Sequence, residues 1–172
     1  MSSHTDPRDI AFSAAVKQIQ DEKGSRASYA RAHPWPTTIT DDLADFIATI
    51  ETAFLATASA DGQPYVQHRG GPPGFIRVLD ETTLGLAEFA GNRQYITAGN
   101  LSENARAHLI LMDYRHRRRV KIWGTARHVD DAALTARLMP QGYRARPEGA
   151  LLFTVAAWDI NCPQHIPRLA AF

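Results

Sequence analysis

Arginines placed beside turns are the residues of this sequence best suited to chemistry. Arg69 precedes a loop rich in glycine and proline, and Asn92-Arg93-Gln94 follows a strand-like run that ends at Phe89. A planar guanidinium binds phosphate through paired hydrogen bonds, and backbone N–H groups at the start of a helix bind it further. A helix is expected to begin at about Arg93, so both kinds of donor would meet there. The pattern indicates a phosphate-binding site.

The densest positive charge lies in a run from Arg115 to Arg119, followed by Lys121. Arg119 and Lys121 alternate with apolar residues, so they share one face of a strand and are candidates for contact with a ligand. Arg115 and Arg117 fit a solvent-exposed hairpin tip. A nucleic-acid interface would need aromatic residues for base stacking or a wider positive face, and neither is evident. No nucleic-acid partner is expected.

A second polar cluster, Asp159-Ile160-Asn161-Cys162-Pro163-Gln164-His165, follows the last strand-like run. Cys162 and His165 offer two metal ligands where structural zinc needs four, so no metal site is expected. A Cys–His nucleophilic pair fits the residue types, but a three-residue spacing in a Pro-containing turn does not favour it. The tail either folds over the body of the protein or contributes to a ligand pocket. The pocket candidates are Asn161, Cys162, Gln164 and His165.

His68 stands directly before Arg69 and the Gly- and Pro-rich loop. The glycines of that loop allow the backbone to approach a ligand closely. His68 is therefore either a structural histidine or a further substrate-pocket candidate.

Composition limits the remaining classes. The chain has 172 residues, 44% hydrophobic and 22% charged, which is typical of one globular domain. Its formal net charge of +1 gives no overall attraction to nucleic acid or membrane. No apolar run approaches the roughly 20 residues of a membrane span, and the N-terminus has no signal-peptide pattern. One cysteine is compatible with a reducing compartment. A cytoplasmic protein is expected.

The apolar periodicity predicts two regions. Helical patterns from Pro7 and over Ala27–Ala32 indicate an N-terminal helical extension spanning residues 1–40. Thr40 then caps a helix, and beyond it a period of two predicts hairpin-joined strands over residues 41–172. Strands are expected at 54–59, 64–68, 75–79, 83–89, 109–114, 119–129 and 151–158, with helices from Arg93 and Asp130 and a capping box formed by Asn100 and Glu103. A mainly β fold with flanking helices, arranged as an antiparallel barrel, follows.

Three segments resemble the FMN-binding split-barrel family related to pyridoxamine 5′-phosphate oxidase. They are FLATASADGQPYVQHRGGPPGF, TLGLAEFAGNRQYITAGNLSENARAHLILMDY and RRRVKIWGTARHV, and the resemblance covers about residues 43–130. The closing WDINCPQH resembles the tail of one subgroup of that family. The resemblance implies a six-stranded antiparallel split β-barrel and a homodimer that binds FMN at the subunit interface.

The same resemblance implies roles for single residues. In the family's oxidases a basic residue after the second strand and an Arg-Lys pair after the fourth hold the FMN phosphate. Arg69 and Arg93-Gln94 match these places, with glutamine instead of lysine at 94. Arg119 to Lys121 match a flavin-contacting segment. The oxidases' C-terminal motif with its substrate-contacting arginine is replaced by WDINCPQH, so pyridoxamine phosphate is not the implied substrate.

The expected function is that of an FMN-dependent oxidoreductase acting on a small molecule, with NADH or NADPH as a candidate electron donor. Asn92 would join Arg69, Arg93 and Gln94 in anchoring the cofactor, and Gln164 and His165 would cover the flavin ring or the substrate site. The alternative is a flavin- or haem-binding carrier or sensor that does not turn over.

Overall fold

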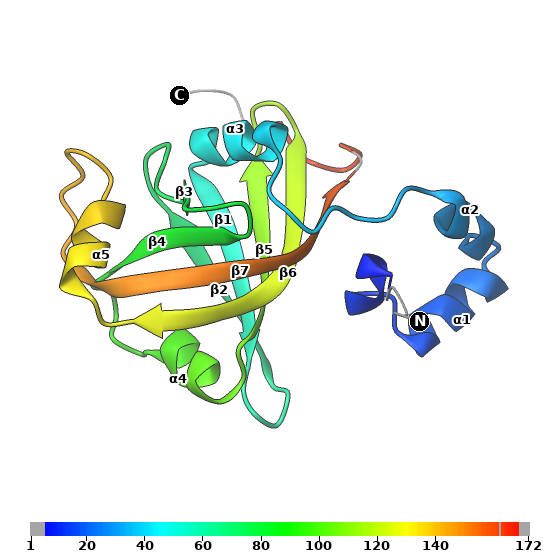
Figure 1. Cartoon of the computed structure of the whole chain (residues 1–172), viewed down its shortest axis with the longest axis horizontal. Coiled ribbons are helices and arrows are strands. Elements are labelled where there is room, and N and C mark those ends of the chain that lie inside the picture. The colour runs from blue at the N-terminus through cyan, green and yellow to red at the C-terminus, as the bar shows by residue number, and fades with distance from the viewer. Residues whose placement is uncertain (1–5, 162, 169–172) are drawn as a thin grey trace.

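The computed structural model describes residues 6–161 and 163–168 of the chain, and Figure 1 shows their arrangement. Among these residues a single antiparallel sheet runs in the order β2-β1-β5-β6-β7-β4-β3. The strands are β1 Thr52–Ala58, β2 Pro64–Gly70, β3 Arg77–Val78, β4 Thr83–Phe89, β5 Arg106–Asp113, β6 Arg118–Val129 and β7 Pro147–Asn161. The helices are η1 Pro7–Ile10, α1 Ala14–Glu22, α2 Arg26–Arg31, α3 Asp41–Thr49, α4 Ile96–Glu103 and α5 Ala132–Leu138.

The expected mainly β barrel with flanking helices is confirmed, although the described sheet has seven strands rather than six. Six of the strands are long, and β3 adds two residues at one edge. A strand over 75–79 was too long an expectation, because Phe75 and Ile76 are buried in the core as part of the loop before β3. Strand β3 is therefore limited to Arg77–Val78, and the Phe75 and Ile76 side chains lie inside the barrel.

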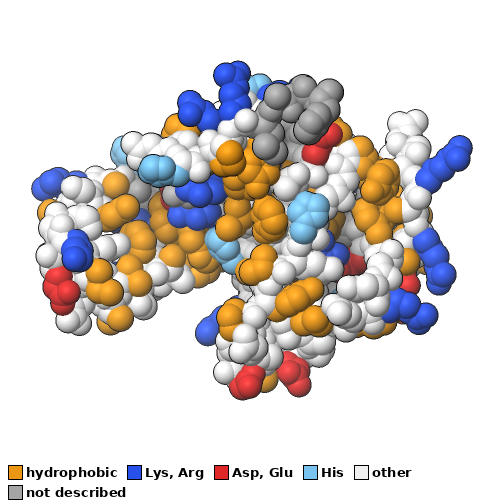
Figure 2. Space-filling view, turned by 180° about the vertical axis from the view of Figure 1, so that it is seen from behind, with side chains coloured by type: hydrophobic (Ala, Val, Ile, Leu, Met, Phe, Trp, Pro, Cys, Tyr) orange, Lys and Arg blue, Asp and Glu red, His pale blue; other side chains and the backbone are white. Residues whose placement is uncertain are grey.

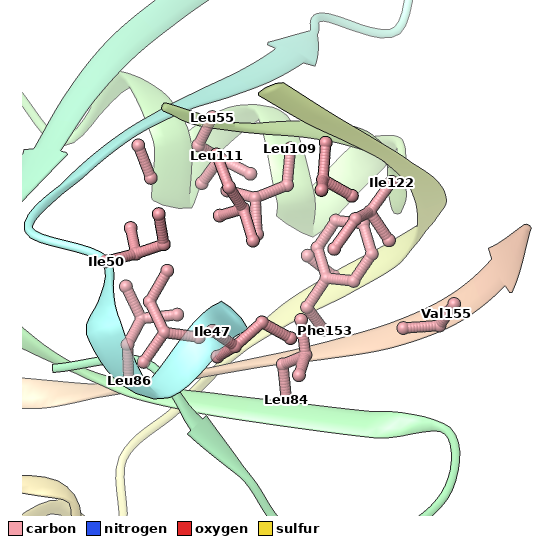
Figure 3. Close-up of a cluster of buried hydrophobic side chains, with 14 of the residues drawn as sticks. Ile47, Ile50, Leu55, Leu84, Leu86, Leu109, Leu111, Ile122, Phe153 and Val155 are labelled. Carbon is pink, nitrogen blue, oxygen red and sulfur yellow. The ribbon is translucent and has the colours of Figure 1, made fainter. Parts of the chain in front are cut away.

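The barrel interior is filled by the alternating inward side chains of the strands. Leu55 of β1, Leu109 and Leu111 of β5, and Phe153 of β7 are each at most 2% exposed, as the close-up in Figure 3 shows. Helix α3 contributes Ile47 to the same cluster. Burial of such side chains stabilises the fold by about 1.5–3 kcal/mol each.

The helices occupy the ends and one side of the barrel. Helices α3 and α4 lie at opposite ends (Figure 1). Thr40 begins α3 by accepting a hydrogen bond from the Leu43 N–H, as the N-cap preference of threonine predicts. Helix α5 packs outside β4 and β7, where Leu138 is buried with Ala87 and Ala150.

The N-terminal helices form an arm beside the barrel (Figure 1). Pro7 begins a short 3₁₀ helix and not a long α-helix, and α1 starts separately where Ser13 accepts a hydrogen bond from the Val16 N–H. The Trp35 ring joins the arm to the barrel by stacking on Trp123 of β6, with ring centroids 4.6 Å apart. Among the described residues, no helix combines the length and the hydropathy that crossing a membrane requires.

The outer face of β1, β2 and β5 carries apolar side chains. Phe54 of β1 is paired with Ile110 of β5 and with His68 of β2 on this face. Val66 of β2 is 59% exposed. Figure 2 views the molecule from behind, where hydrophobic side chains gather in the middle of the barrel surface.

Candidate functional site

The barrel is open between its edge strand β2 and strand β4, and a cavity of about 520 Å³ lies at this split. Its walls come from β2, the end of β4, the loop between β4 and α4, the first turn of α4, His128 of β6 and the segment that begins β7. Arg69, Asn92, Arg93 and Gln94 all line it. The structure therefore brings together the four residues that the sequence indicates for phosphate binding.

Arg69 faces the interior because it lies directly opposite the buried Ala53 on β1. Its Nη2 donates to Oε1 of Glu88 on β4 over 2.7 Å, an ion pair that spans the split. Its buried Nε has no hydrogen-bond partner among the described residues. A buried donor without a partner is costly, so this guanidinium is suited to receive another acceptor.

Glu88 has a second partner in the cavity wall. His128 of β6 forms a hydrogen bond to Glu88 Oε2 through Nδ1. The side chains of Arg69 and Glu88 are each 13% exposed, and that of His128 is 36% exposed. Three strands thus contribute one ionisable group each to a cluster at the same end of the barrel.

The loop before α4 has an unusual backbone. Arg93 and Tyr95 adopt left-handed conformations, with φ of 59° and 53°, and the Asn92 side chain accepts the Gln94 N–H over 3.3 Å. These conformations prevent a helix from beginning at Arg93, and α4 begins at Ile96. The expected helix start was three residues too early.

The exposed Arg93 side chain is oriented by Tyr95. Its Nε donates to the Tyr95 hydroxyl over 3.3 Å, and this contact raises the pKa of Arg93 above its ordinary value. The Tyr95 hydroxyl in turn donates to Glu148 over 3.5 Å, a long contact. Arg93 therefore remains charged at the cavity mouth.

Helix α4 is fixed against the barrel by two side-chain hydrogen bonds. Thr97 donates to Gln67 of β2 over 2.7 Å, and Asn100 donates to Thr57 of β1 over 3.0 Å. Asn100 and Glu103 lie in the later turns of α4, so the interpretation of these two residues as a helix-starting capping box was wrong. The first residues of α4 line the cavity, and its N-terminus has no side-chain cap.

The other predicted ligand residues lie elsewhere. Arg119 and Lys121 point away from the interior of the barrel, on β6, where Lys121 pairs with Asp159 over 3.3 Å and lies 5.0 Å from the centre of the Trp123 ring. His68 packs edge-to-face on Phe54 on the outer face of the sheet. None of these three lines the cavity at the split.

The described polar residues of the tail, Gln164 and His165, do not line this cavity. Gln164 and His165 are exposed in a turn beyond β7, and His165 has a φ of 62°. The Asn161 backbone pairs with Arg119 at the end of β7. Cys162 lies outside the described residues. Among the residues of the tail that the structure describes, none lines the cavity at the split within one chain.

Sequence reasoning missed Glu88, His128 and Tyr95 as cavity residues. A signal for Glu88 was present, because it is in phase with the buried Leu84 and Leu86 of the same strand. His128 is likewise in phase with the buried Ala126. A charged residue at a strand position that faces the interior indicates either a buried ion-pair partner or a ligand-binding site.

A second groove, of about 770 Å³, lies between η1 and the outer face of β5 and β6. His108 lines it, 4.7 Å from the Trp123 ring measured between ring centres. Burial lowers the pKa of His108 to about 4, and the charge of Lys121 acts in the same direction. His108 is therefore neutral at neutral pH, and its buried Nε2 has no partner among the described residues.

The chain resembles solved structures of the same architecture. HupZ of Group A Streptococcus superposes with a TM-score of 0.58 at 21% identity, covering 77% of this chain and 99% of that chain. An FMN-binding protein from Syntrophomonas wolfei subsp. wolfei gives 0.54 at 8% identity, covering 83% and 96%. A Clostridium acetobutylicum protein related to general stress protein 26, of the pyridoxinephosphate oxidase family, gives 0.50 at 15% identity, covering 73% and 87%. At these identities the likeness concerns the fold.

No curated protein matches the chain. The family model described as pyridoxamine 5′-phosphate oxidase matches residues 39–162, from the approach to α3 to the end of β7. This segment is well over half of the sequence and contains every strand of the described sheet. The protein belongs to the pyridoxamine 5′-phosphate oxidase family.

Proposed function

We propose that the protein binds FMN in the cavity at the barrel split and acts as a flavin-dependent oxidoreductase on a small molecule. The observation that carries the proposal is Arg69: its buried Nε has no partner among the described residues, and it lies in a cavity that Asn92, Arg93 and Gln94 also line. A phosphate dianion fits this donor set, because arginine pairs with phosphate through charge-assisted hydrogen bonds. Membership of the family supports flavin as the group that carries the phosphate.

The remaining cavity residues suit the rest of such a ligand. The uncapped N-terminus of α4 directs backbone N–H groups and a partial positive charge to the cavity, which favours an anion there. Asn92 and Gln94 offer amide groups for the hydroxyls of a ribityl chain. When bound, the flavin would supply hydride or electron transfer, and the protein residues would bind and orient it.

The protein is proposed to be a homodimer with the flavin at its interface. Arg119, Lys121, Gln164 and His165 do not line the cavity within their own chain. They would contribute to a flavin site only across an interface, as the proposed dimer allows. The apolar outer face around Phe54, Val66 and Ile110 is the proposed contact surface.

The absorbance spectrum of the protein as purified tests the proposal. We expect the two near-ultraviolet and blue bands of a bound flavin, retained through gel filtration, and oxidation of NADH or NADPH when an acceptor is supplied. Arg69→Gln should lose most of the bound flavin. Arg77→Gln is the matched control, because Arg77 is exposed on β3 and lies outside this cavity. Equal flavin retention in both variants would refute the assignment of Arg69.

A second candidate is a carrier or sensor that binds haem without turnover. The observation that favours it is the neutral His108 in the groove between η1 and the outer face of β5 and β6. Neutral imidazole is the form that binds haem iron. Titration with haem separates the two functions. A Soret band that sharpens on binding and is lost in His108→Ala would support the carrier, and its absence would leave the flavin enzyme.

A further inference from the structure

Glu88 occupies the place where a ligand anion would meet Arg69. The two residues come from β4 and β2, which are not neighbours in the sheet, and their ion pair spans the opening of the barrel. The carboxylate uses one oxygen for Arg69 Nη2 at 2.7 Å and the other for His128 Nδ1. With both oxygens engaged and 13% of its side chain exposed, Glu88 is held inside the cavity wall.

Carboxylate and phosphate are recognised by arginine in the same way, through parallel N–H···O bonds. In this structure Glu88 engages only Nη2, and the buried Nε stays without a partner among the described residues. Arg69 is thus half satisfied by an anion that belongs to the chain itself. A phosphate arriving at Arg69 meets a resident negative charge a few ångströms away, and like charges at that distance repel.

The other charged residues of the cavity show which carboxylate a ligand phosphate would meet at Arg69. Its lining contains three arginines, at 69, 93 and 146, and two glutamates, at 88 and 148. Of the two carboxylates, only that of Glu88 is bonded to an arginine of the cavity, because Glu148 accepts from the Tyr95 hydroxyl. Glu88 is therefore the acidic group that a ligand phosphate must displace or tolerate.

We propose that Glu88 is an internal counter-ion that competes with the ligand's phosphate for Arg69, and that His128 retains the carboxylate when the phosphate replaces it. This inference rests on the proposed function, because the ligand phosphate is taken to be that of FMN. Its consequence is an exchangeable flavin. The site binds the phosphorylated cofactor less tightly than its arginines alone would allow, and Glu88 limits the preference for FMN over riboflavin.

The test is a fluorescence titration of flavin-free protein with FMN and with riboflavin. Glu88→Gln removes the charge and keeps the shape, so it should tighten FMN binding about five- to tenfold and change riboflavin binding less than about twofold. Glu148→Gln is the matched control, since it removes the same charge from the same cavity without freeing an arginine. Its gain in FMN affinity should be clearly smaller.

The competition for Arg69 is tested by a double-mutant cycle. In an Arg69→Gln background the gain from Glu88→Gln should vanish. Loss of FMN affinity in Glu88→Gln would show that Glu88 positions Arg69, and equal gains in Glu88→Gln and Glu148→Gln would show an effect of net charge alone. Either result overturns the inference.

His128→Gln gives an independent variant in case Glu88→Gln does not fold. It weakens the second hold on the carboxylate, so Glu88 should remain on Arg69 and FMN affinity should fall about threefold or more. An unchanged or raised affinity contradicts the role assigned to His128.

Orthophosphate separates a failure of this inference from a failure of the proposed function. If neither the wild type nor Glu88→Gln binds flavin, the proposed function fails. The inference about Glu88 then stands if millimolar phosphate raises the unfolding temperature of Glu88→Gln more than that of the wild type. It falls if the two shifts are equal or absent.

Discussion

At the scale of the residue, position on a strand decides what each ionisable group can do. Arg69, Glu88 and His128 face the inside of the barrel and bond to one another, whereas Lys121 and His108 lie on the outside among aromatic rings. The inward groups form the candidate anion site. The pKa of the outward His108 is lowered by burial and by the charge of the neighbouring lysine.

Arg93→Ala should weaken FMN retention roughly tenfold, because it removes a charge-assisted contact at the mouth of the cavity. The left-handed φ of 59° at this position also disfavours alanine, so Arg93→Asn is the variant that tolerates the backbone while removing the charge. Flavin stoichiometry after gel filtration measures both. Full retention in both variants would remove Arg93 from the site.

His108 makes the stability of the fold depend on pH. Its pKa is lowered from 6.5 to about 4 by burial, so the unfolded chain binds the proton more readily than the folded one. The folded state keeps its full stability above about pH 6.5, where His108 is neutral in both the folded and the unfolded chain. Part of this stability is lost as the pH falls towards 4, because the unfolded chain then binds a proton at His108. After allowance for the part of the ring that reaches solvent, the loss should be about 1–2 kcal/mol.

Urea unfolding at pH 7, 5 and 4 measures this loss. His108→Gln should flatten the decline of unfolding free energy between pH 6.5 and 4. His33→Gln is the control, because His33 is exposed in the arm and the variant should follow the wild-type profile. A parallel decline in wild type and His108→Gln would contradict the assignment to His108.

At the scale of the element, the strands create the site by the way they bend and end. The pairing of β6 with β7 shifts register between Trp123 and Gly124, a bulge at which Ala156 of β7 has no partner on β6. A Cβ built at Gly124 would lie 1.9 Å from the Thr154 carbonyl oxygen, a backbone atom. The close approach of the two strands there requires glycine.

Gly124→Ala should therefore lower the free energy of unfolding by about 2–3 kcal/mol, because β7 must move to admit the methyl group. Gly99→Ala is the matched control in α4, where no atom lies within 4 Å of the added carbon. It should stabilise the protein by about 0.5–1 kcal/mol through helix propensity. Denaturant unfolding of both variants checks the opposite signs.

At the scale of the whole molecule, the barrel leaves two features without a partner inside one described chain. One is the apolar outer face of β1, β2 and β5, and the other is Ile19 on the arm, which is 55% exposed. Exposed apolar side chains gathered on one surface indicate an interaction site. A second copy of the chain is the occupant proposed above.

Val66→Asp should convert the proposed dimer to a monomer, since it places a charge in the middle of the outer face. Val78→Asp is the control on β3, away from that face. Sedimentation velocity gives the mass of each. A monomeric wild type would end the proposal of a dimer, and a dimeric Val66→Asp with wild-type affinity would place the interface elsewhere.

The sequence by itself determined the class of fold and identified the arginines that are candidates for binding a phosphate. Alternation with a period of two is a local property, so the strands that contain the buried Leu55, Leu109 and Phe153 could be predicted. The cap at Thr40 was equally local. For the same reason, Arg69 and Arg93 could be singled out from the turns beside them.

Only the tertiary structure decided which charges meet. Arg69 pairs with Glu88 because the sheet curves until its edge strand faces β4, and no local pattern contains that closure. Arg93 and Tyr95 have left-handed backbone conformations, so α4 begins only at Ile96. These conformations depend on the path by which the loop returns to the barrel. Pairing across the split is a property of distant segments, so a strand pattern can supply the residues of this site but cannot specify their contacts.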